Sequence, residues 1–191
     1  MIAAVDRNAK TCREVGVRME LLEGIVHVGT DTEPGHASVG AFVKRLEQIG
    51  ARYNVTCQAF DARYIVSARH LERAVELADR ERARGSGIAR DRGVEVLLYA
   101  AGRRQIDQAL ELGIGQGETP AVVLLSVEDE GNTTAAAAAA RKLLVPEDTL
   151  GAYDKMLVKN FFNVGERELA ATDAGLESLV LERVALLVID R

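Results

Sequence analysis

The chain has 191 residues, of which 48% are hydrophobic and 28% charged, and its formal net charge is −5 at pH 7. This balance is typical of a globular protein and excludes an intrinsically disordered chain, which would have too little apolar surface to fold. The length favours one well-buried domain that spans residues 1–191.

The cysteine content and the apolar runs indicate the compartment. Cys12 and Cys57 lie far apart and neither has a CxxC partner, so neither a disulfide framework nor a zinc knuckle is indicated. Charged residues interrupt positions 1–18, where a signal peptide would need an apolar core. No run of about eighteen apolar residues occurs that could span a membrane. We therefore expect a cytoplasmic protein without a membrane partner.

The first part of the chain alternates predicted strands and helices. Residues 24–29 (GIVHVG) are rich in β-branched side chains and predict a strand. Ser38 is placed to cap a helix after it. The apolar face of that helix repeats at helical spacing, at Val39, Phe42, Val43, Leu46 and Ile49. Residues 55–66 then predict a pair of strands or one bulged strand, with the interruption near Asp61.

Helices are predicted in the middle of the chain. Ser67 is placed to cap a helix that ends at the glycines of residues 85–87. A second helix is predicted over residues 88–101, and helical spacing resumes over residues 103–112. The apolar run AVVLLSV, which follows Pro120, is typical of a strand covered on both faces and should be the most buried strand of the sheet.

The last third of the chain is predicted to be helical, at residues 133–144, 146–162, 166–171 and 176–189. A run of six alanines in the first of these segments favours a helix that packs closely against a neighbour. The predicted fold class is therefore α/β of the mixed α+β kind. We expect a small, mostly antiparallel or mixed sheet of about four strands with about seven to eight packed helices.

Positive charge is concentrated in the middle of the chain. Residues 63–104 contain ten arginines and six acidic residues, so this segment carries +4 on a chain whose total is −5. Five of the arginines lie at predicted helix ends and glycine breaks, namely Arg84, Arg90, Arg92, Arg103 and Arg104. Guanidinium groups in such positions can bind phosphates or stack on the bases of single-stranded RNA. We expect these five to bind RNA, and the alternative is that neighbouring carboxylates neutralise them.

Few residues are candidates for catalysis or for binding a metal. Asp61, Ser67 and His70 suggest a catalytic triad, but Ser67 is explained as a helix cap and no nucleophile-elbow pattern surrounds it. The three histidines form no compact ligand set. The glycines of residues 113–117 precede a strand, whereas a dinucleotide-binding loop follows one. We therefore expect no catalytic residue, no metal and no cofactor.

Apolar residues beyond the inward helix stripes indicate a surface for a protein partner. Val94, Leu98 and Ile106 form the candidate docking surface. The last predicted helix, residues 176–189, is apolar on most sides, so it is either central in the fold or shared with a partner. We expect it to lie in the core.

Three segments resemble a known family. IVSARHL (65–71), GVEVLLYAAGRRQI (93–106) and LERVALL (181–187) are similar, in this order and spacing, to the kinase-binding small subunit of the KEOPS complex, the PRPK-binding protein or CGI-121 family. The resemblance implies a non-catalytic accessory subunit that binds the small atypical kinase or ATPase subunit of KEOPS through helices. It also implies recruitment of tRNA by its single-stranded 3′ CCA end.

In that family the chemistry belongs to other subunits. The complex installs a threonylcarbamoyl group on an adenosine of tRNAs that read ANN codons, and the resemblance implies that the threonylcarbamoyltransferase is an indirect partner of this chain. Whether the isolated chain forms a homodimer stays open. Two alternatives also stay open: a small hydrolase-like or nucleotide-dependent α/β enzyme that uses Asp61, Ser67 and His70, and a purely structural adaptor that does not contact RNA.

Overall fold

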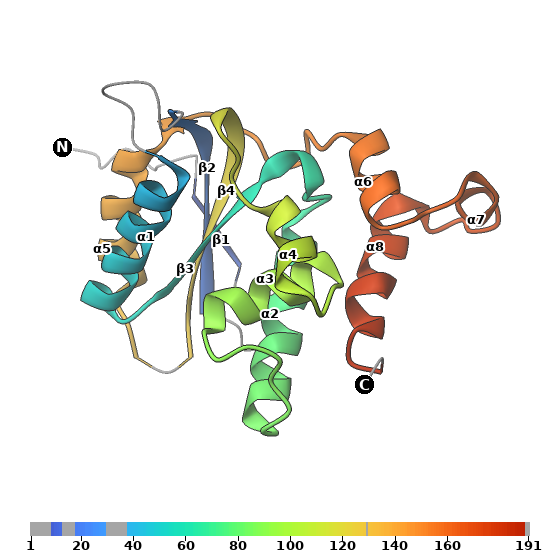
Figure 1. The fold of residues 1–191 in the computed structure, drawn as a ribbon, viewed down its shortest axis with the longest axis horizontal. Helices are drawn as coiled ribbons and strands as arrows, with labels where there is room; N and C mark the ends of the chain where they lie inside the picture. Colours follow the sequence, from blue (N-terminus) through green and yellow to red (C-terminus); the bar gives the residue numbers. More distant parts are fainter. Residues whose placement is uncertain (1–8, 13–17, 30–37, 129, 190–191) are drawn as a thin grey trace.

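One antiparallel sheet with helices on both faces organises the chain (Figure 1). The computed structural model describes residues 9–12, 18–29, 38–128 and 130–189. The strands are β1 (Ala9–Cys12), β2 (Arg18–Val28), β3 (Thr56–Asp61), β4 (Gly117–Val127) and β5 (Val145–Pro146). The helices are α1 (Val39–Tyr53), α2 (Ala68–Ala83), α3 (Arg92–Ala101), α4 (Ile106–Ala109), α5 (Thr133–Ala140), α6 (Lys155–Phe161), α7 (Glu166–Ala170) and α8 (Gly175–Leu186). Short 3-10 turns are η1 (Ala62–Tyr64), η2 (Leu110–Leu112) and η3 (Arg141–Leu143).

The strand order is β1-β2-β4-β3, and β5 also pairs with β2. The long strands β2 and β4 pair over their whole length, from Arg18 opposite Val127 to Val28 opposite Gly117. Strands β1 and β5 share the other edge of β2. Among the described strands β3 pairs with β4 alone, so no strand covers the other edge of β3.

Alternate residues of β4 supply two separate cores. Val122 and Leu124 pack with α2, α3 and α8 on one face of the sheet, whereas Val123 and Leu125 pack with α1 and α5 on the other. Successive side chains of a strand point to opposite faces, so a strand that is covered on both sides must be apolar throughout. This confirms the prediction that the AVVLLSV run is a buried strand.

The mixed α+β fold with an antiparallel sheet is confirmed. Both predicted caps are present, because Ser38 accepts a hydrogen bond from Ala41 N at 3.3 Å and Ser67 accepts one from His70 N at 3.3 Å. The alanine-rich segment forms α5, which packs on α1 through small buried side chains. Within the described residues no helix is both long enough and apolar enough to cross a membrane.

Several predicted elements differ from the observed ones in their bounds. The strand predicted over residues 24–29 is the second half of β2, which begins at Arg18 and ends at Val28. Residues 55–66 form one strand and a 3-10 turn, because the Asp61 carboxylate accepts a hydrogen bond from Arg63 N at 3.0 Å and turns the chain. Residues 146–162 are helical only in α6, after β5 and a loop.

A buried carboxylate holds the loop that stands where the helix predicted over residues 88–101 should begin. Residues 88–91 are not helical, and α3 begins at Arg92 with Asp91 as its cap. Glu95 is fully buried and accepts hydrogen bonds from Ile88 N at 3.0 Å and Ala89 N at 2.5 Å. The Glu95 carboxylate thus gives both loop N–H groups a hydrogen-bond acceptor. A helix is therefore not needed to satisfy them.

Candidate docking groove and cationic surfaces

The five arginines that were predicted to bind RNA do not gather at one place. Helices α2 and α3 pack antiparallel, because His70 near the start of α2 binds Ala100 near the end of α3, while Arg92 at the start of α3 binds Asp79 near the end of α2. Arg84 and Arg90 therefore lie at one end of this helix pair, and Arg103 and Arg104 lie at the other. The ten residues of α3 separate the two groups by about 15 Å.

Arg92 is a structural residue. Its side chain is 7% exposed, and its guanidinium binds both carboxylate oxygens of Asp79, at 2.7 and 2.8 Å. The remaining nitrogen donates to Ser126 Oγ at 2.6 Å. The guanidinium thus joins α3 to α2 and to β4, and it has no free donor face for a phosphate. We therefore remove Arg92 from the candidate RNA contacts.

The other four arginines differ in how many contacts they form with the rest of the protein. Arg103 lies over the ring of Phe161, 5.3 Å from its centroid, and donates to the Phe161 carbonyl at 2.5 Å. Arg104 donates to the Leu187 carbonyl at 3.5 Å. Arg84 pairs with Glu81 at 3.0 Å although 59% of its side chain is exposed. Arg90 is exposed and forms no ion pair with any described residue.

The predicted kinase-binding residues also have different environments. Leu98 is fully buried in the core, so it cannot contact a partner while α3 is folded. Val94 is partly buried. Ile106 is 49% exposed, and Leu110, one helical turn later, is 58% exposed. We call Ile106 and Leu110 the α4 ridge; the spacing of four residues is the sequence signal that would have identified Leu110.

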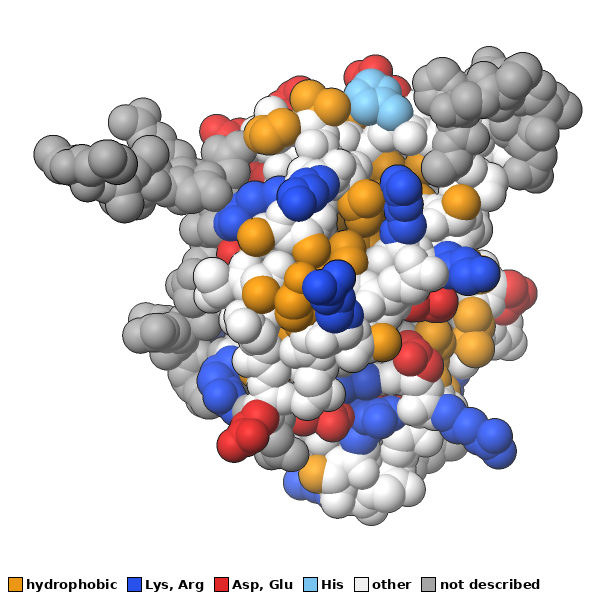
Figure 2. Space-filling model, turned by 90° about the vertical axis from the view of Figure 1, so that its left-hand side faces the viewer, with side chains coloured by type: hydrophobic (Ala, Val, Ile, Leu, Met, Phe, Trp, Pro, Cys, Tyr) orange, Lys and Arg blue, Asp and Glu red, His pale blue; other side chains and the backbone are white. Residues whose placement is uncertain are grey.

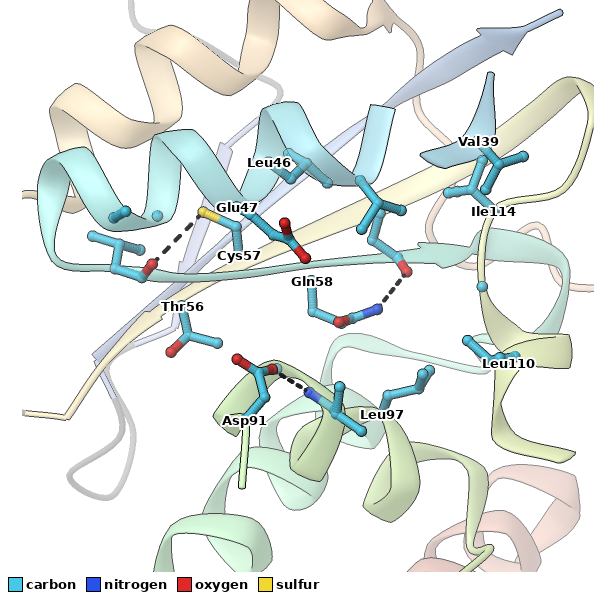
Figure 3. Close-up of a pocket in the computed structure, with 18 residues that line it drawn as sticks. Val39, Leu46, Glu47, Thr56, Cys57, Gln58, Asp91, Leu97, Leu110 and Ile114 are labelled. Carbon is cyan, nitrogen blue, oxygen red and sulfur yellow. Dashed lines mark hydrogen bonds between the residues drawn. The ribbon is translucent and has the colours of Figure 1, made fainter. Parts of the chain in front are cut away.

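A groove of about 600 Å³ runs along the uncovered edge of β3 (Figure 3). Helix α1 forms one wall, with Val39, Val43 and Glu47. Helix α3 and the η2 turn form the other, with Leu97 and Leu110. The edge of β3 is the floor. We call this the β3 groove. Strand order creates it, because β3 is the last strand of the sheet and helices flank it on both faces.

Two glycines allow the walls to approach the floor. A Cβ atom on Gly50 of α1 would lie 2.6 Å from the Val55 carbonyl oxygen. A Cβ atom on Gly93 of α3 would lie 3.1 Å from Asp91 Oδ1 and 3.2 Å from Gln58 Oε1. The contact at Gly50 is with backbone and is too short for any other residue, so this position requires glycine. A larger residue at position 93 would need the ends of the Asp91 and Gln58 side chains to shift by a few tenths of an ångström.

The β3 groove is apolar with a negative rim. Figure 3 shows the Glu47 side chain directed from α1 into the groove, and Asp91 at its lower wall caps α3 by accepting from Val94 N at 2.9 Å. No basic residue is among the described residues that line it. Burial raises the pKa of the Cys57 thiol to about 12, so the thiol stays protonated and is a poor nucleophile.

A second surface, which the sequence analysis did not identify, is cationic. Figure 2 shows lysine and arginine side chains among hydrophobic ones on the face formed by α1 and α5. Lys44, Arg45, Arg52 and Lys142 are the cations, and none forms an ion pair with a described residue. The Arg52 guanidinium lies 5.5 Å from the centroid of the Tyr53 ring. We call this the α1–α5 face.

The α1–α5 face is concave where its two helices meet. A hollow of about 450 Å³ is lined by Arg45, Arg52, Tyr53 and Lys142, together with Gln48 and three apolar side chains. Residues 39–53 contain three basic residues and one acid, which is the sequence signal for half of this surface. Lys142 could not be assigned to it from sequence, because only the packing of α5 on α1 brings it there.

Asp61, Ser67 and His70 do not assemble as a triad. Ser67 Oγ donates to Glu177 Oε1 at 2.6 Å, and His70 Nε2 donates to the Ala100 carbonyl at 2.8 Å. Asp61 is paired with the neighbouring arginine. Burial lowers the pKa of His70 to about 4, and the hydrogen bond to Ala100 and the charge of Glu177 oppose this shift. Each of the three side chains thus has a structural partner.

Within the described part of the chain no three His, Cys, Asp or Glu side chains gather in a way that could hold a metal ion.

In the comparison with known proteins, a family model described as "Kinase binding protein CGI-121" matches residues 40–187. The matched segment runs from α1 to the end of α8 and contains the β3 groove, the α4 ridge and the α1–α5 face. No curated protein matches the chain.

Proposed function

The chain belongs to the CGI-121 family of kinase-binding proteins, and we propose that it is a non-catalytic accessory subunit of the KEOPS complex. In this role it binds the small atypical kinase subunit and brings tRNA to the complex, while the partner transferase carries out threonylcarbamoyl transfer. The chain acts as one unit that supplies binding surfaces.

The α4 ridge supports the kinase-docking part of the proposal. Ile106 and Leu110 are among the most exposed large apolar residues, and they lie four residues apart, at the start of α4 and at the start of the η2 turn that follows it. Val43, which is 43% exposed, lines the opposite wall of the adjoining groove. Because about half of each side chain is already buried, burying the rest against a partner stabilises a complex by about 1 kcal/mol for each side chain. This apolar pair is the observation that carries the proposal.

Co-purification with the kinase subunit tests the ridge. The charge of an Ile106→Glu variant would be buried at the interface without a partner, so we expect the complex to be lost. Met156→Glu is the matched control, because Met156 is 61% exposed on α6, away from the ridge. Circular dichroism should show that both variants are folded. An Ile106→Glu, Leu110→Glu double variant that still co-purifies would refute docking through this ridge.

The α1–α5 face supports the RNA-binding part. Its four cations have no carboxylate partner among the described residues, so a phosphate backbone can bind them without displacing an existing ion pair. Tyr53 offers an aromatic face within the same hollow. We propose that this face provides most of the attraction for tRNA. Arg84, Arg90, Arg103 and Arg104 remain proposed contacts of smaller weight, because three of them are already engaged.

A gel shift with the isolated chain tests RNA binding. We expect a full-length tRNA to bind more tightly than the same tRNA without its 3′ CCA end, because the unpaired tail can reach into the hollow beside Tyr53. Equal binding of both RNAs would contradict recognition of the tail. Failure of both RNAs to bind at low salt would favour the structural-adaptor alternative.

A further inference from the structure

The floor of the β3 groove is a strand edge that no described strand pairs with, and its residues range from the partly exposed Cys57 to Ala59, which is 5% exposed. The Ala59 carbonyl accepts a hydrogen bond from its neighbour's side-chain amide, Gln58 Nε2, at 3.1 Å, so it does not depend on β4. The Cys57 carbonyl lies 3.6 Å from the point where a Cβ on Gly93 would stand, so it faces α3. Both carbonyls therefore point into the groove.

The amides of the same two residues face the same way. In an antiparallel strand the N–H and C=O of one residue point to the same side, and the sides alternate along the strand. Gln58 and Phe60 therefore bond to β4, whereas Cys57 and Ala59 present a donor and an acceptor each to the groove. The Gln58 amide occupies one acceptor in the free protein, much as the N–H of a neighbouring strand would.

The walls suit a single extended segment. Side chains of a strand laid along β3 would point alternately toward α1 and toward α3. They would meet Val39 and Val43 on one side and Val94 and Leu97 on the other. A second copy of this chain would have to bring its own α1 and α3 against these walls, whereas an isolated extended segment brings no helices with it.

The charge of the groove indicates the composition of that segment. Glu47 forms no ion pair with any described residue, and its carboxylate points into the groove. Asp91 adds a second exposed carboxylate, and no cation lines the groove within the described residues. A lysine or arginine near the Glu47 end of the segment would be attracted, whereas an acidic segment would be repelled.

Leu110 connects this groove to the α4 ridge, because it is part of both. We propose that an extended segment of the kinase partner adds to β3 as a further strand. The segment is apolar at alternate positions and carries a lysine or arginine beside Glu47. This inference rests on the proposed kinase docking, and it names the backbone pairing that the ridge alone would not require.

Amide hydrogen exchange, measured by NMR on the chain alone and in complex with the kinase subunit, tests the inference. The Cys57 and Ala59 amides should exchange faster than those of Gln58 and Phe60 in the free chain. They should slow by about tenfold or more in the complex, because they gain hydrogen bonds. A complex that forms without any slowing refutes strand addition and leaves kinase docking intact. Failure to form a complex refutes both.

Charge reversal gives an independent test. Glu47→Lys should weaken kinase binding by about tenfold, because it replaces an attraction by a repulsion. Glu147→Lys is the matched control, since Glu147 is exposed and lies outside the groove. If Glu47→Lys binds as tightly as the control, while Ile106→Glu abolishes binding, the contact is confined to the α4 ridge and the inference is wrong.

Discussion

Arg92 and Asp79 form a two-pronged ion pair, with Nε 2.7 Å from Oδ1 and an Nη nitrogen 2.8 Å from Oδ2. The pair joins the beginning of α3 to the end of α2. Arg90, two residues earlier, is exposed in the connecting loop. Arg90 and Arg92 look equivalent in the sequence, but they differ in the structure. Arg92 holds two helices together, whereas Arg90 is exposed to solvent.

The first prediction follows from this difference. Arg92→Met should lower the free energy of unfolding by about 3 kcal/mol, because it leaves Asp79 and the buried Ser126 hydroxyl without their partner. Arg90→Met should change it by less than about 0.5 kcal/mol. Urea denaturation followed by circular dichroism measures both values. Equal stability of the two variants would contradict the structural role of Arg92.

A second prediction separates the core from the docking surface. Leu98→Glu places a charge at a fully buried position, so we expect it to destabilise the protein by more than about 4 kcal/mol and to prevent folding. Leu110→Glu should be folded, with a melting temperature close to that of the unmodified chain, because Leu110 is 58% exposed. Thermal unfolding distinguishes the two. A stable Leu98→Glu protein would mean that α3 can move away from the core.

The sequence was sufficient for features that depend on neighbouring residues. Ser38 and Ser67 cap their helices through bonds that span three residues, and the run after Pro120 must be buried whatever its partners are. The order of charged and apolar residues also predicted the α+β class. In each case the residues that determine the feature lie close together in the sequence.

The features that could not be predicted depend on contacts between distant segments. The burial of Arg92 requires Asp79 and Ser126 to meet in space. Residues 146–154 are not helical, because the buried Glu23 carboxylate accepts hydrogen bonds from the backbone amides of Thr149 and Leu150, at 2.9 and 2.7 Å. The β3 groove exists only because β3 is at the end of the strand order.

A third prediction concerns the salt dependence of RNA binding. Arg45→Gln combined with Arg52→Gln should weaken tRNA binding and reduce the slope of log affinity against log salt by about 0.7 for each lost single-strand phosphate contact. Arg84→Gln with Arg90→Gln removes the same charge from the other side of the sheet and should have the smaller effect. The reverse ranking would move the RNA surface to the loop that joins α2 to α3.

The last prediction concerns pH and His70. The pKa of His70 is lowered from 6.5 to about 4, chiefly because the ring is fully buried, so the folded protein keeps it neutral. The unfolded chain binds a proton near pH 6.5. The stabilisation is therefore complete above pH 6.5 and decreases as the pH falls from 6.5 toward 4, by about 3 kcal/mol over that range.

His70→Gln isolates this contribution from that of the carboxylates, which titrate in the variant as they do in the unmodified chain. Glutamine can still donate to the Ala100 carbonyl, but it does not bind a proton. The unmodified chain should therefore lose more stability than the variant between pH 7 and pH 4.5, and the difference between them should shift by about 2 kcal/mol. Urea denaturation at both pH values measures that difference. A constant difference would show that solvent reaches His70, in which case α2 and α3 would pack less tightly around it than the contacts with Ala100 and Phe162 imply.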